Sequence, residues 1–313
     1  MDESTSAFTS KPIISICLTT YNHVNYIAQA IESVLAQCVE VPWELIIADD
    51  CSGDGTSAIA RSYAEKFPHI IRYCRNSKNL GALKNWLLAL DAAQGEYIAH
   101  LDGDDYWTDR QKLAKQYSIL QNHPECVLCY TNGIRLYPDG KSQPLISSPL
   151  NFIHDWGQLL NHGLVPLLSS CLWRKCHHPT QWPKWAASTL FGDVVLFTLL
   201  SLKGSFYFLN EPTVVYRTHP NSWIQICASA DARCHHALQL YDHFDELTAY
   251  RYHHQYNKQR ADQLEYLAFS YMKKNKWMTA LRFMLQSLWI HPLRRKSELS
   301  RAYYRFKWAL QHS

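Results

Sequence analysis

The sequence lacks a long apolar segment and is not rich in charge. Its longest mainly apolar run covers about residues 194–202, far short of the roughly 20 residues that span a bilayer. Residues 1–11 lack the basic start and the apolar stretch of a secretory signal. With 47% hydrophobic and 19% charged residues, the composition excludes a disordered chain. We therefore expect a folded, cytoplasmic protein of one large domain, or of one domain plus an appendage.

Cysteine pairs of the kind that staple small secreted domains are also missing. The ten cysteines are scattered over 313 residues, several of them within apolar runs, and a chain of this length needs no disulfides to fold. Cys126 and Cys129 have C-x-x-C spacing, but no second pair follows them. In a strand, these two side chains point to opposite faces. Buried free thiols are therefore the better interpretation.

Acidic residues are nearly absent from the end of the chain, although the formal charge of the whole is only +4. Residues 273–313 hold ten Lys or Arg and one acid, Glu298, which gives +9. The first 272 residues hold the other 21 basic and 26 acidic residues, which gives −5. The sequence thus joins a mildly acidic body to a strongly basic tail.

Short β-rich runs alternate with helical periods from about residue 13 to residue 130. Predicted strands cover 13–19, 43–48, 70–74 and 97–101, and predicted helices cover about 24–38, 56–66 and 83–90. This alternation predicts an α/β fold with a mostly parallel sheet that carries helices on both faces. Ligands of such sheets bind beyond the carboxyl ends of the strands.

The pattern changes in the second half of the chain. Residues 138–183 are predicted to form loops, followed by a helix from Val194 and a strand at 213–217. From about residue 230 only helices are predicted, and two of them form a hairpin around Asn275.

Carboxylates cluster at the end of the fourth predicted strand. Asp102, Asp104 and Asp105 lie within four residues, and like charges this close repel unless a cation or hydrogen-bond donors offset them. Oxygen-only clusters suit Mg²⁺ or Mn²⁺, which in turn bind phosphates. The structural alternative is a solvated turn rich in Asp.

A second polar segment, residues 49–56 (DDCSGDGT), ends the second predicted strand and opens a helix. Asp, Ser and Gly favour turns, and Thr56 is a suitable cap for that helix. Taken alone, the segment is equally well explained as a capped turn. Its position at the same sheet edge as the Asp102 cluster favours a ligand site.

Six segments in order resemble the inverting glycosyltransferase family 2, which has the GT-A fold. They are 15–22 (SICLTTYN), 48–56 (ADDCSGDGT), 79–85 (NLGALKN), 95–107 (GEYIAHLDGDDYW), Gly192-Asp193 before an apolar helix, and 216–219 (YRTH). The resemblance covers about residues 12–222. It implies a mixed, mostly parallel sheet flanked by helices, here followed by a C-terminal helical extension.

The resemblance also assigns residues to a nucleotide site: Thr19, Tyr21, Asn22, Asp50, Lys84 and Asp102. Tyr21 offers a flat face for base stacking, and Asp50 accepts a hydrogen bond that only an imide-type base donates. That chemistry favours a UDP- or dTDP-sugar. Asp102 contacts the ribose or a metal-bound water, and Lys84 and Arg217 are cations near the diphosphate or sugar.

The metal site implied by the resemblance consists of Asp104, Asp105 and His219. Asp104 binds Mn²⁺ or Mg²⁺ between the two phosphates, Asp105 supports it, and His219 is a further contact to the metal or diphosphate. Such a cation neutralises charge on the departing nucleoside diphosphate. Apart from the YRTH segment, His219 is one of sixteen histidines, and a lone histidine is usually structural.

An inverting transfer needs a carboxylate to take the proton of the acceptor hydroxyl. The resemblance implies Asp193 as this base, although Gly192 stands where many relatives have Glu. The alternative is that Asp193 only caps the helix that begins at Val194.

The function implied by the resemblance is metal-dependent transfer of a hexosyl or N-acetylhexosaminyl group to a hydroxyl of a growing surface glycan or lipid-linked acceptor. Residues 1–225 are the expected catalytic domain, with a nucleotide-binding half at 12–135 and an acceptor half at 136–225, and 226–313 are the helical extension. The alternatives are a non-catalytic nucleotide-sugar or carbohydrate-binding protein and a nucleotidyltransferase. The latter usually has a Gly-rich loop after its first strand, where this chain has Thr20-Tyr21-Asn22.

The basic tail has three interpretations. Its apolar positions recur at helical spacing: Leu299, Ala302, Tyr303, Phe306 and Leu310. Together with the positive charge of 291–313, this pattern fits a helix on an anionic membrane, which places the protein peripherally on the inner face of the cytoplasmic membrane. The other interpretations are packing on the catalytic domain and, least favoured, nucleic-acid contact, so we expect no nucleic-acid partner. A homodimer contact is a further role for the extension.

Overall fold

The structure is a computed structural model that describes residues 11–147, 152–220, 222 and 228–292. The chain divides into two compact units. Residues 1–156 with 166–222 form the first unit, and residues 157–165 with 223–313 form the second.

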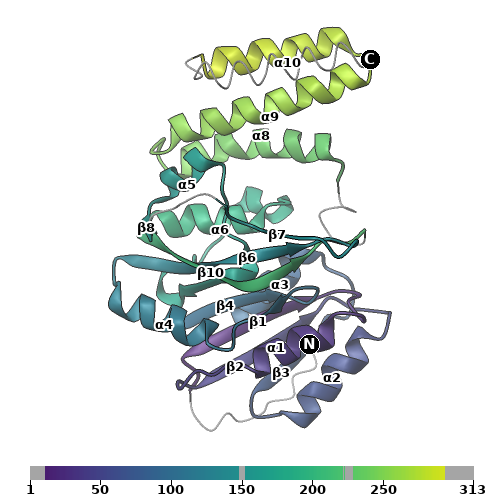
Figure 1. The fold of residues 1–313 in the computed structure, drawn as a ribbon, viewed down its shortest axis with the longest axis vertical. Coiled ribbons are helices and arrows are strands. Elements are labelled where there is room, and N and C mark those ends of the chain that lie inside the picture. The colour runs from purple at the N-terminus through teal and green to yellow at the C-terminus, as the bar shows by residue number, and fades with distance from the viewer. Residues whose placement is uncertain (1–10, 148–151, 221, 223–227, 293–313) are drawn as a thin grey trace. The chain divides into compact units, whose positions relative to one another are not determined.

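A ten-stranded sheet forms the centre of the first unit (Figure 1). Its strands are β1 (Ile14–Thr20), β2 (Trp43–Asp49), β3 (Ile71–Arg75), β4 (Tyr97–Asp102), β5 (Tyr106–Trp107), β6 (Cys126–Leu136), β7 (Ser142–Pro144), β8 (Ile153–His154), β9 (Cys171–Arg174) and β10 (Ser205–Arg217). The spatial order is β3-β2-β1-β4-β9-β6-β10-β5, with β7 paired to β6 and β8 to β10. Strands β1 to β4 are parallel to one another, whereas β9 is antiparallel to both of its neighbours. The predicted α/β class, with a mixed and mostly parallel sheet, is confirmed.

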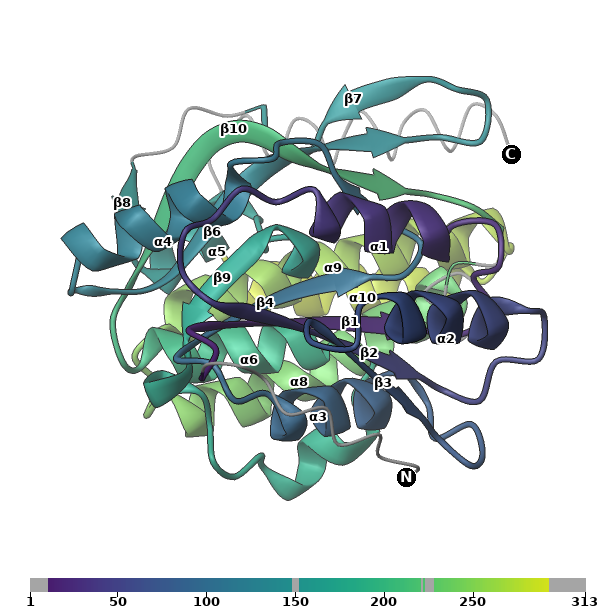
Figure 2. The same cartoon turned by 90° about the horizontal axis from the view of Figure 1, so that it is seen from below.

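Helices cover both faces of this sheet: α1 (Ile27–Leu35), α2 (Thr56–Lys66), α3 (Ala82–Ala92), α4 (Lys112–Asn122) and α6 (Gly192–Ser201). Alternate apolar residues of β1 share one buried cluster with the inner face of α1: Ile14, Ile16, Leu18, Ile27 and Ile31. Cys17 points the other way and donates from Sγ to the Ala89 carbonyl of α3 at 3.4 Å. Figure 2 shows α1 and α3 on opposite faces of the sheet. The period-2 alternation of β1 therefore places one helix on each side.

The region predicted as loops, residues 138–183, contains regular structure. It holds β7, β8, α5 (Trp156–His162), β9 and two short 3-10 helices, η1 (Leu168–Ser170) and η2 (Lys175–His177); a third, η3 (Lys184–Ser188), follows it. The prediction of loops was wrong because β7, β8 and β9 are two to four residues long, too short to show a period of two. Two further expectations need a smaller correction, since α6 begins at Gly192 rather than Val194, and β10 begins at Ser205 rather than at 213.

The second unit consists of α8 (Ala230–Leu247), α9 (His253–Lys273) and α10 (Trp277–Ile290), with residues 157–162 of α5. Arg260 of α9 bonds to Asp245 of α8 at 2.7 Å, and Gln259 donates to the Leu160 carbonyl at 2.6 Å. Asn275 has a φ of 58° and turns the chain between α9 and α10, as the sequence predicted. None of the helices in the described part of the chain has the length and apolar character that a bilayer crossing requires. The predicted helix over 299–310 lies outside the described residues.

Candidate active site

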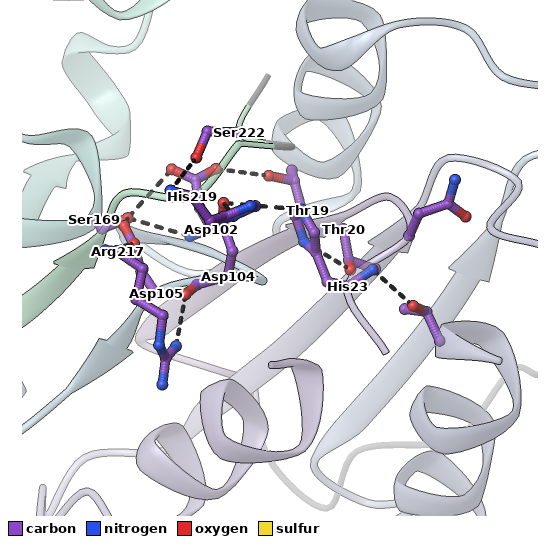
Figure 3. Close-up of polar contacts among 12 residues, drawn as sticks. Thr19, Thr20, His23, Asp102, Asp104, Asp105, Ser169, Arg217, His219 and Ser222 are labelled. Carbon is purple, nitrogen blue, oxygen red and sulfur yellow. Dashed lines mark hydrogen bonds and ion pairs between the residues drawn. The ribbon is translucent and has the colours of Figure 1, made fainter. Parts of the chain in front are cut away.

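The register of the parallel strands brings the predicted polar residues to one sheet edge. Thr19 pairs with Asp102 across β1 and β4, and Thr20 pairs with Asp49 across β1 and β2. Thr19 Oγ1 donates to Asp102 Oδ1 at 3.2 Å. Figure 3 shows this pair beside the residues that follow β4 and β10. The carboxyl ends of β1 and β4 thus form the floor of the site.

Both carboxylate oxygens of Asp102 lie within a polar network, and its side chain is 42% exposed. His100 Nε2 lies 3.1 Å from Asp102 Oδ1, and Ser169 Oγ lies 3.3 Å from Asp102 Oδ2. Burial opposes ionisation of Asp102, but the neighbouring His100 imidazole outweighs it and leaves the pKa of that carboxyl below its usual range. Asp102 is therefore an anion that a ligand can reach.

Asp104 is brought together with His219, which lies just beyond the end of β10. His219 Nε2 is 3.0 Å from Asp104 Oδ2, and His23 Nε2 is 3.9 Å from the same oxygen. Arg217 donates from Nη1 to the Asp104 backbone carbonyl at 2.6 Å, and its guanidinium lies over the Tyr106 ring at 4.4 Å. The end of β10 therefore fixes both the loop that carries Asp104 and the imidazole beside it (Figure 3).

Asp105 is fully buried and uses both carboxylate oxygens inside the protein. Its Oδ1 accepts from the Arg217 backbone N–H at 3.0 Å, and its Oδ2 accepts from Ser169 Oγ at 3.0 Å. Burial, together with the charges of Asp104 and Asp102, raises the pKa of Asp105 well above its usual range. Its contacts join the Asp102 loop to β10 and η1.

Gly103 separates Asp102 from Asp104 at a place with no room for a side chain. A Cβ there would lie 2.7 Å from Thr20 Oγ1, 2.9 Å from Thr20 Cβ and 2.9 Å from His23 Nδ1. The backbone of the loop therefore lies against β1, which fixes the two carboxylates on either side.

Asp50, the predicted base contact, is buried at the end of β2 and is held by three donors. Its Oδ1 accepts from Asn76 Nδ2 at 2.9 Å and from the Leu80 N–H at 2.8 Å, and its Oδ2 accepts from the Gly81 N–H at 2.9 Å. A carboxylate offers about four acceptor directions, so about one remains for a ligand. These contacts also join the start of α3 to the strand end.

The other predicted nucleotide residues differ in how open they are. Tyr21 is 42% exposed, and Lys84 is exposed on α3. Asn22 has a φ of 56° and is bonded to the 49–56 segment: its N–H donates to Ser52 Oγ and its Oδ1 accepts from the Gly53 N–H, both at 2.9 Å. The Asn22 side chain therefore holds the loop together, whereas Tyr21 and Lys84 are free to contact a ligand.

Asp193 is the second residue of α6, and the N-cap of this helix is Phe191, without a side-chain capping bond. Asp193 Oδ1 accepts from the Val194 N–H at 2.9 Å. Burial raises the pKa of Asp193 to about 6, and the charge of Asp102 adds to this although the Val194 N–H opposes it. Gly192 packs on α3, since a Cβ there would lie 2.7 Å from Leu83 Cδ1. Asp193 thus lies within the electrostatic reach of Asp102.

Three polar residues of this network were not predicted from the sequence: His23, His100 and Ser169. His100 lies two residues before Asp102 in β4, so period two places both side chains on one face, and this signal was available. His23 follows the predicted Asn22 directly, but its contact with Asp104 depends on the loop. Ser169 has no local signal, because it lies 67 positions from Asp102 and reaches it through tertiary packing.

Among the described residues, no group of three or more His, Cys, Asp or Glu side chains is arranged to hold a metal ion. The carboxylate of Asp104 and the imidazole of His219 are nevertheless suited to bind a metal ion. Two adjacent ligands of an octahedral ion with bonds of about 2.1 Å lie about 3 Å apart, and Asp104 Oδ2 and His219 Nε2 have a separation of 3.0 Å. Carboxylate and imidazole donors fit a divalent cation such as Mn²⁺.

Relatives of known sequence align with about two thirds of the chain. A family model described as glycosyl transferase family 2 matches residues 15–165. The uncharacterized protein Rv1520 of Mycobacterium tuberculosis is 35% identical over 208 residues, which are 66% of this chain and 59% of that protein. TuaG of Bacillus subtilis, a glycosyltransferase assigned to teichuronic acid biosynthesis, is 32% identical over 214 residues, 68% of this chain and 81% of TuaG. The chain thus spans less than two thirds of the mycobacterial relative.

Solved structures share the fold. S. aureus TarS 1-349 in complex with UDP-GlcNAc superposes with a TM-score of 0.59 at 16% identity, over 88% of this chain and 81% of TarS. The mannosyltransferase PcManGT from Pyrobaculum calidifontis, in complex with GDP-Man and Mn²⁺, gives 0.56 at 13% identity, over 99% and 87% of the two chains. The expected GT-A fold is confirmed. Because the family model matches residues 15–165 and this chain is 32% identical to TuaG over 81% of that protein, the chain belongs to glycosyltransferase family 2.

Proposed function

We propose that the protein is a metal-dependent inverting glycosyltransferase that moves a sugar from a UDP- or dTDP-sugar to a hydroxyl of a growing surface glycan or lipid-linked acceptor. The observation that carries the proposal is the contact of His219 with Asp104 beside the ionised Asp102, at the edge where β1 and β4 end. This placement argues for a catalytic site over a carbohydrate-binding surface. The relation to TuaG supports a glycan acceptor.

In this proposal Asp104 and His219 hold a divalent cation, Mn²⁺ or Mg²⁺. The ion, when bound, neutralises charge on the leaving nucleoside diphosphate. Asp102 stands beside this pair, with Thr19 and His100 fixing its orientation. Asp105 has a supporting role, because its oxygens are bonded to Arg217 and Ser169. The Mn²⁺ bound by PcManGT supports the choice of ion.

The nucleotide base lies, in this proposal, between Tyr21 and Asp50, in the 12–135 half of the domain. The exposed Tyr21 ring stacks on the base. Asp50 takes its last hydrogen bond from the imide N–H of uracil or thymine. UDP-GlcNAc bound by TarS supports a uridine donor, whereas GDP-Man bound by PcManGT is the competing choice. Lys84, exposed on α3, contributes a positive charge toward the diphosphate or sugar.

Asp193 serves as the general base. A base works best when its pKa is close to the operating pH while it remains ionised, and burial brings the pKa of Asp193 to about 6. The carboxylate accepts the proton of the acceptor hydroxyl while that oxygen attacks the anomeric carbon from the face opposite the leaving diphosphate. Its bond to the Val194 N–H fixes the direction of the free oxygen.

The donor class is tested by thermal unfolding with UDP, dTDP or GDP, each with and without Mn²⁺. A ligand that binds the native state raises the melting temperature. We expect UDP or dTDP to stabilise the protein, and to do so more strongly with Mn²⁺. Stabilisation by GDP alone would move the donor to the guanine class, and a response to none of the three would contradict the proposal.

A further inference from the structure

Helix α10 packs on its neighbour α9 through two small side chains and the half-buried Phe283, whose ring centroid lies 5.5 Å from that of Tyr271, and exposes six large apolar side chains. Ala280 and Ser287 are buried, and Ser287 Oγ donates to the Ala261 carbonyl of α9 at 3.1 Å. The outer face of α10 consists of six apolar residues that are 39% to 84% exposed: Trp277, Met278, Leu281, Leu285, Leu288 and Trp289. A surface helix normally buries its large apolar residues, whereas α10 leaves six of them exposed.

The six residues form one continuous face. With 3.6 residues per turn they occupy an arc of about 120° around the helix, and Arg282 lies at its edge. Trp289, Met278 and Leu285 are the most exposed, at 84%, 80% and 59%. Contiguous apolar patches of this kind mark interaction sites on soluble proteins.

The charges of α10 and of the residues that flank it in the sequence have one sign. Residues 273–296 contain seven Lys or Arg and no acid. Lys273 and Lys276 are exposed before the helix, Arg282 is exposed within it, and Arg294, Arg295 and Lys296 follow it in the sequence. Lys274 is the exception among the described cations of this stretch, because Asp231 pairs with it at 2.6 Å. A tryptophan lies near each end of the helix, as is typical of helices at the membrane interface.

We propose that the outer face of α10 binds the surface of an anionic lipid bilayer, with the helix lying in the plane of the interface. A helix of 14 residues is too short to span the bilayer, whereas burial of its apolar face in the headgroup region and attraction of the flanking cations act together. This inference rests on the proposed function, because a lipid-linked acceptor would be presented to the enzyme at a membrane surface.

Two other occupants of this face, a second copy of the chain and residues 293–313, do not complement its positive charge. A second copy of the chain would bring one basic helix end against another in either orientation, and like charges repel. Residues 293–313 of the chain itself include apolar positions, but with six basic residues and one acid they bring no opposite charge to the cations of this face. An anionic bilayer is complementary to the cations and to the apolar residues alike.

Flotation of the full chain with vesicles tests the proposal. We expect recovery with phosphatidylcholine vesicles that contain phosphatidylglycerol to exceed recovery with pure phosphatidylcholine by on the order of tenfold, and to fall at high salt. A triple variant, Leu281→Ser with Leu285→Ser and Trp289→Ser, should lose this binding. The matched control, Val165→Ser with Leu202→Ser and Tyr250→Ser, replaces three residues that are 38% to 60% exposed elsewhere and should float like the wild type.

Flotation of the triple variant at the wild-type level, or failure of the wild type to float, would overturn the proposal. Sedimentation velocity is a further check. A dimeric wild type and a monomeric triple variant, neither of which floats, would assign the face to a second copy of the chain. Circular dichroism and UDP-dependent melting verify that the variants are folded. A protein that binds UDP with Mn²⁺ but does not float contradicts only this inference, and one that floats but binds no nucleotide contradicts only the proposed function.

Discussion

His219 Nε2 lies 3.0 Å from Asp104 Oδ2, although 115 positions separate the two residues. The contact exists because β10 ends at Arg217, whose backbone N–H donates to Asp105 and whose guanidinium donates to the Asp104 carbonyl. The strand thus delivers the imidazole and holds the acidic loop with the same residue. A carboxylate and an imidazole are held together before any ligand binds, which lowers the cost of ordering them.

Replacing His219 should weaken the metal-dependent part of nucleotide binding. We expect His219→Ala to raise the Kd of UDP in Mn²⁺ by about tenfold or more, and to leave Kd without metal unchanged. Calorimetric titration measures both values. His23→Ala is the control, because His23 Nε2 is 3.9 Å from the same oxygen and its loss should change the Kd less. Equal Kd values in Mn²⁺ for the wild type and His219→Ala would remove His219 from the metal site.

The raised pKa of Asp193 predicts an acid limb in the activity profile. The base acts when ionised, so kcat/KM should be level above the pKa of about 6 and fall about tenfold per pH unit below it. Rates of UDP release between pH 4.5 and 8 provide the measurement. A profile without this limb would place the base elsewhere.

The raised pKa of Asp193 also predicts that the stability of the fold falls as the pH rises, whereas activity increases. The folded state holds the Asp193 proton more tightly than the unfolded state does, so Asp193 lowers the stability of the fold as the pH rises through about 6. Asp193→Asn should therefore raise the Tm at pH 8 and change it little at pH 4. If the negative charge of Asp193 instead stabilises the first turn of α6, the substitution lowers the Tm at pH 8.

Ser169 should matter to both stability and ligand binding, because its hydroxyl lies between Asp102 and Asp105. Ser169→Ala leaves buried polar groups without this partner, so we expect the free energy of unfolding to fall by about 1–3 kcal/mol and the Kd of UDP in Mn²⁺ to rise. Urea unfolding and calorimetry measure the two effects.

Ser170→Ala is the matched control for Ser169→Ala. Ser170 is equally buried, but its hydroxyl donates to the Leu167 carbonyl at 2.7 Å. Its loss should cost about 0.5–1.5 kcal/mol of stability without changing the Kd. If both variants bind UDP and Mn²⁺ like the wild type, Ser169 has no part in positioning the carboxylates.

Much of the fold could be predicted from the sequence because β1 to β4 and the helices between them are local patterns of five residues or more. Asp102 and Asp104 were predicted because they follow such a strand directly. Ser169 could not be predicted, since the antiparallel insertion of β9 between β4 and β6 is a long-range pairing. β10 was only partly predicted, since its pairing with β6 shifts register on both sides of Pro212.

Gly103 should tolerate no side chain. Gly103→Ala places a methyl group against Thr20 Cβ and His23 Nδ1, and overpacking of this kind costs about 1–3 kcal/mol. Because the loop carries Asp104, Mn²⁺-dependent UDP binding should fall as well. Gly53→Ala is the control, since no atom lies within 4 Å of a Cβ at that position. Unchanged unfolding and binding in Gly103→Ala would show that the loop relaxes without cost.

Release of UDP or dTDP from a panel of UDP- and dTDP-sugars in Mn²⁺, by the wild type and by Asp193→Asn, tests the donor class and the role of Asp193 together. We expect the wild type to turn over at least one donor, and Asp193→Asn to bind the same nucleotide with equal affinity but to be slower by about 10²- to 10⁴-fold. Equal turnover by the two proteins, or no turnover of any donor by a wild type that binds UDP and Mn²⁺, would contradict this expectation.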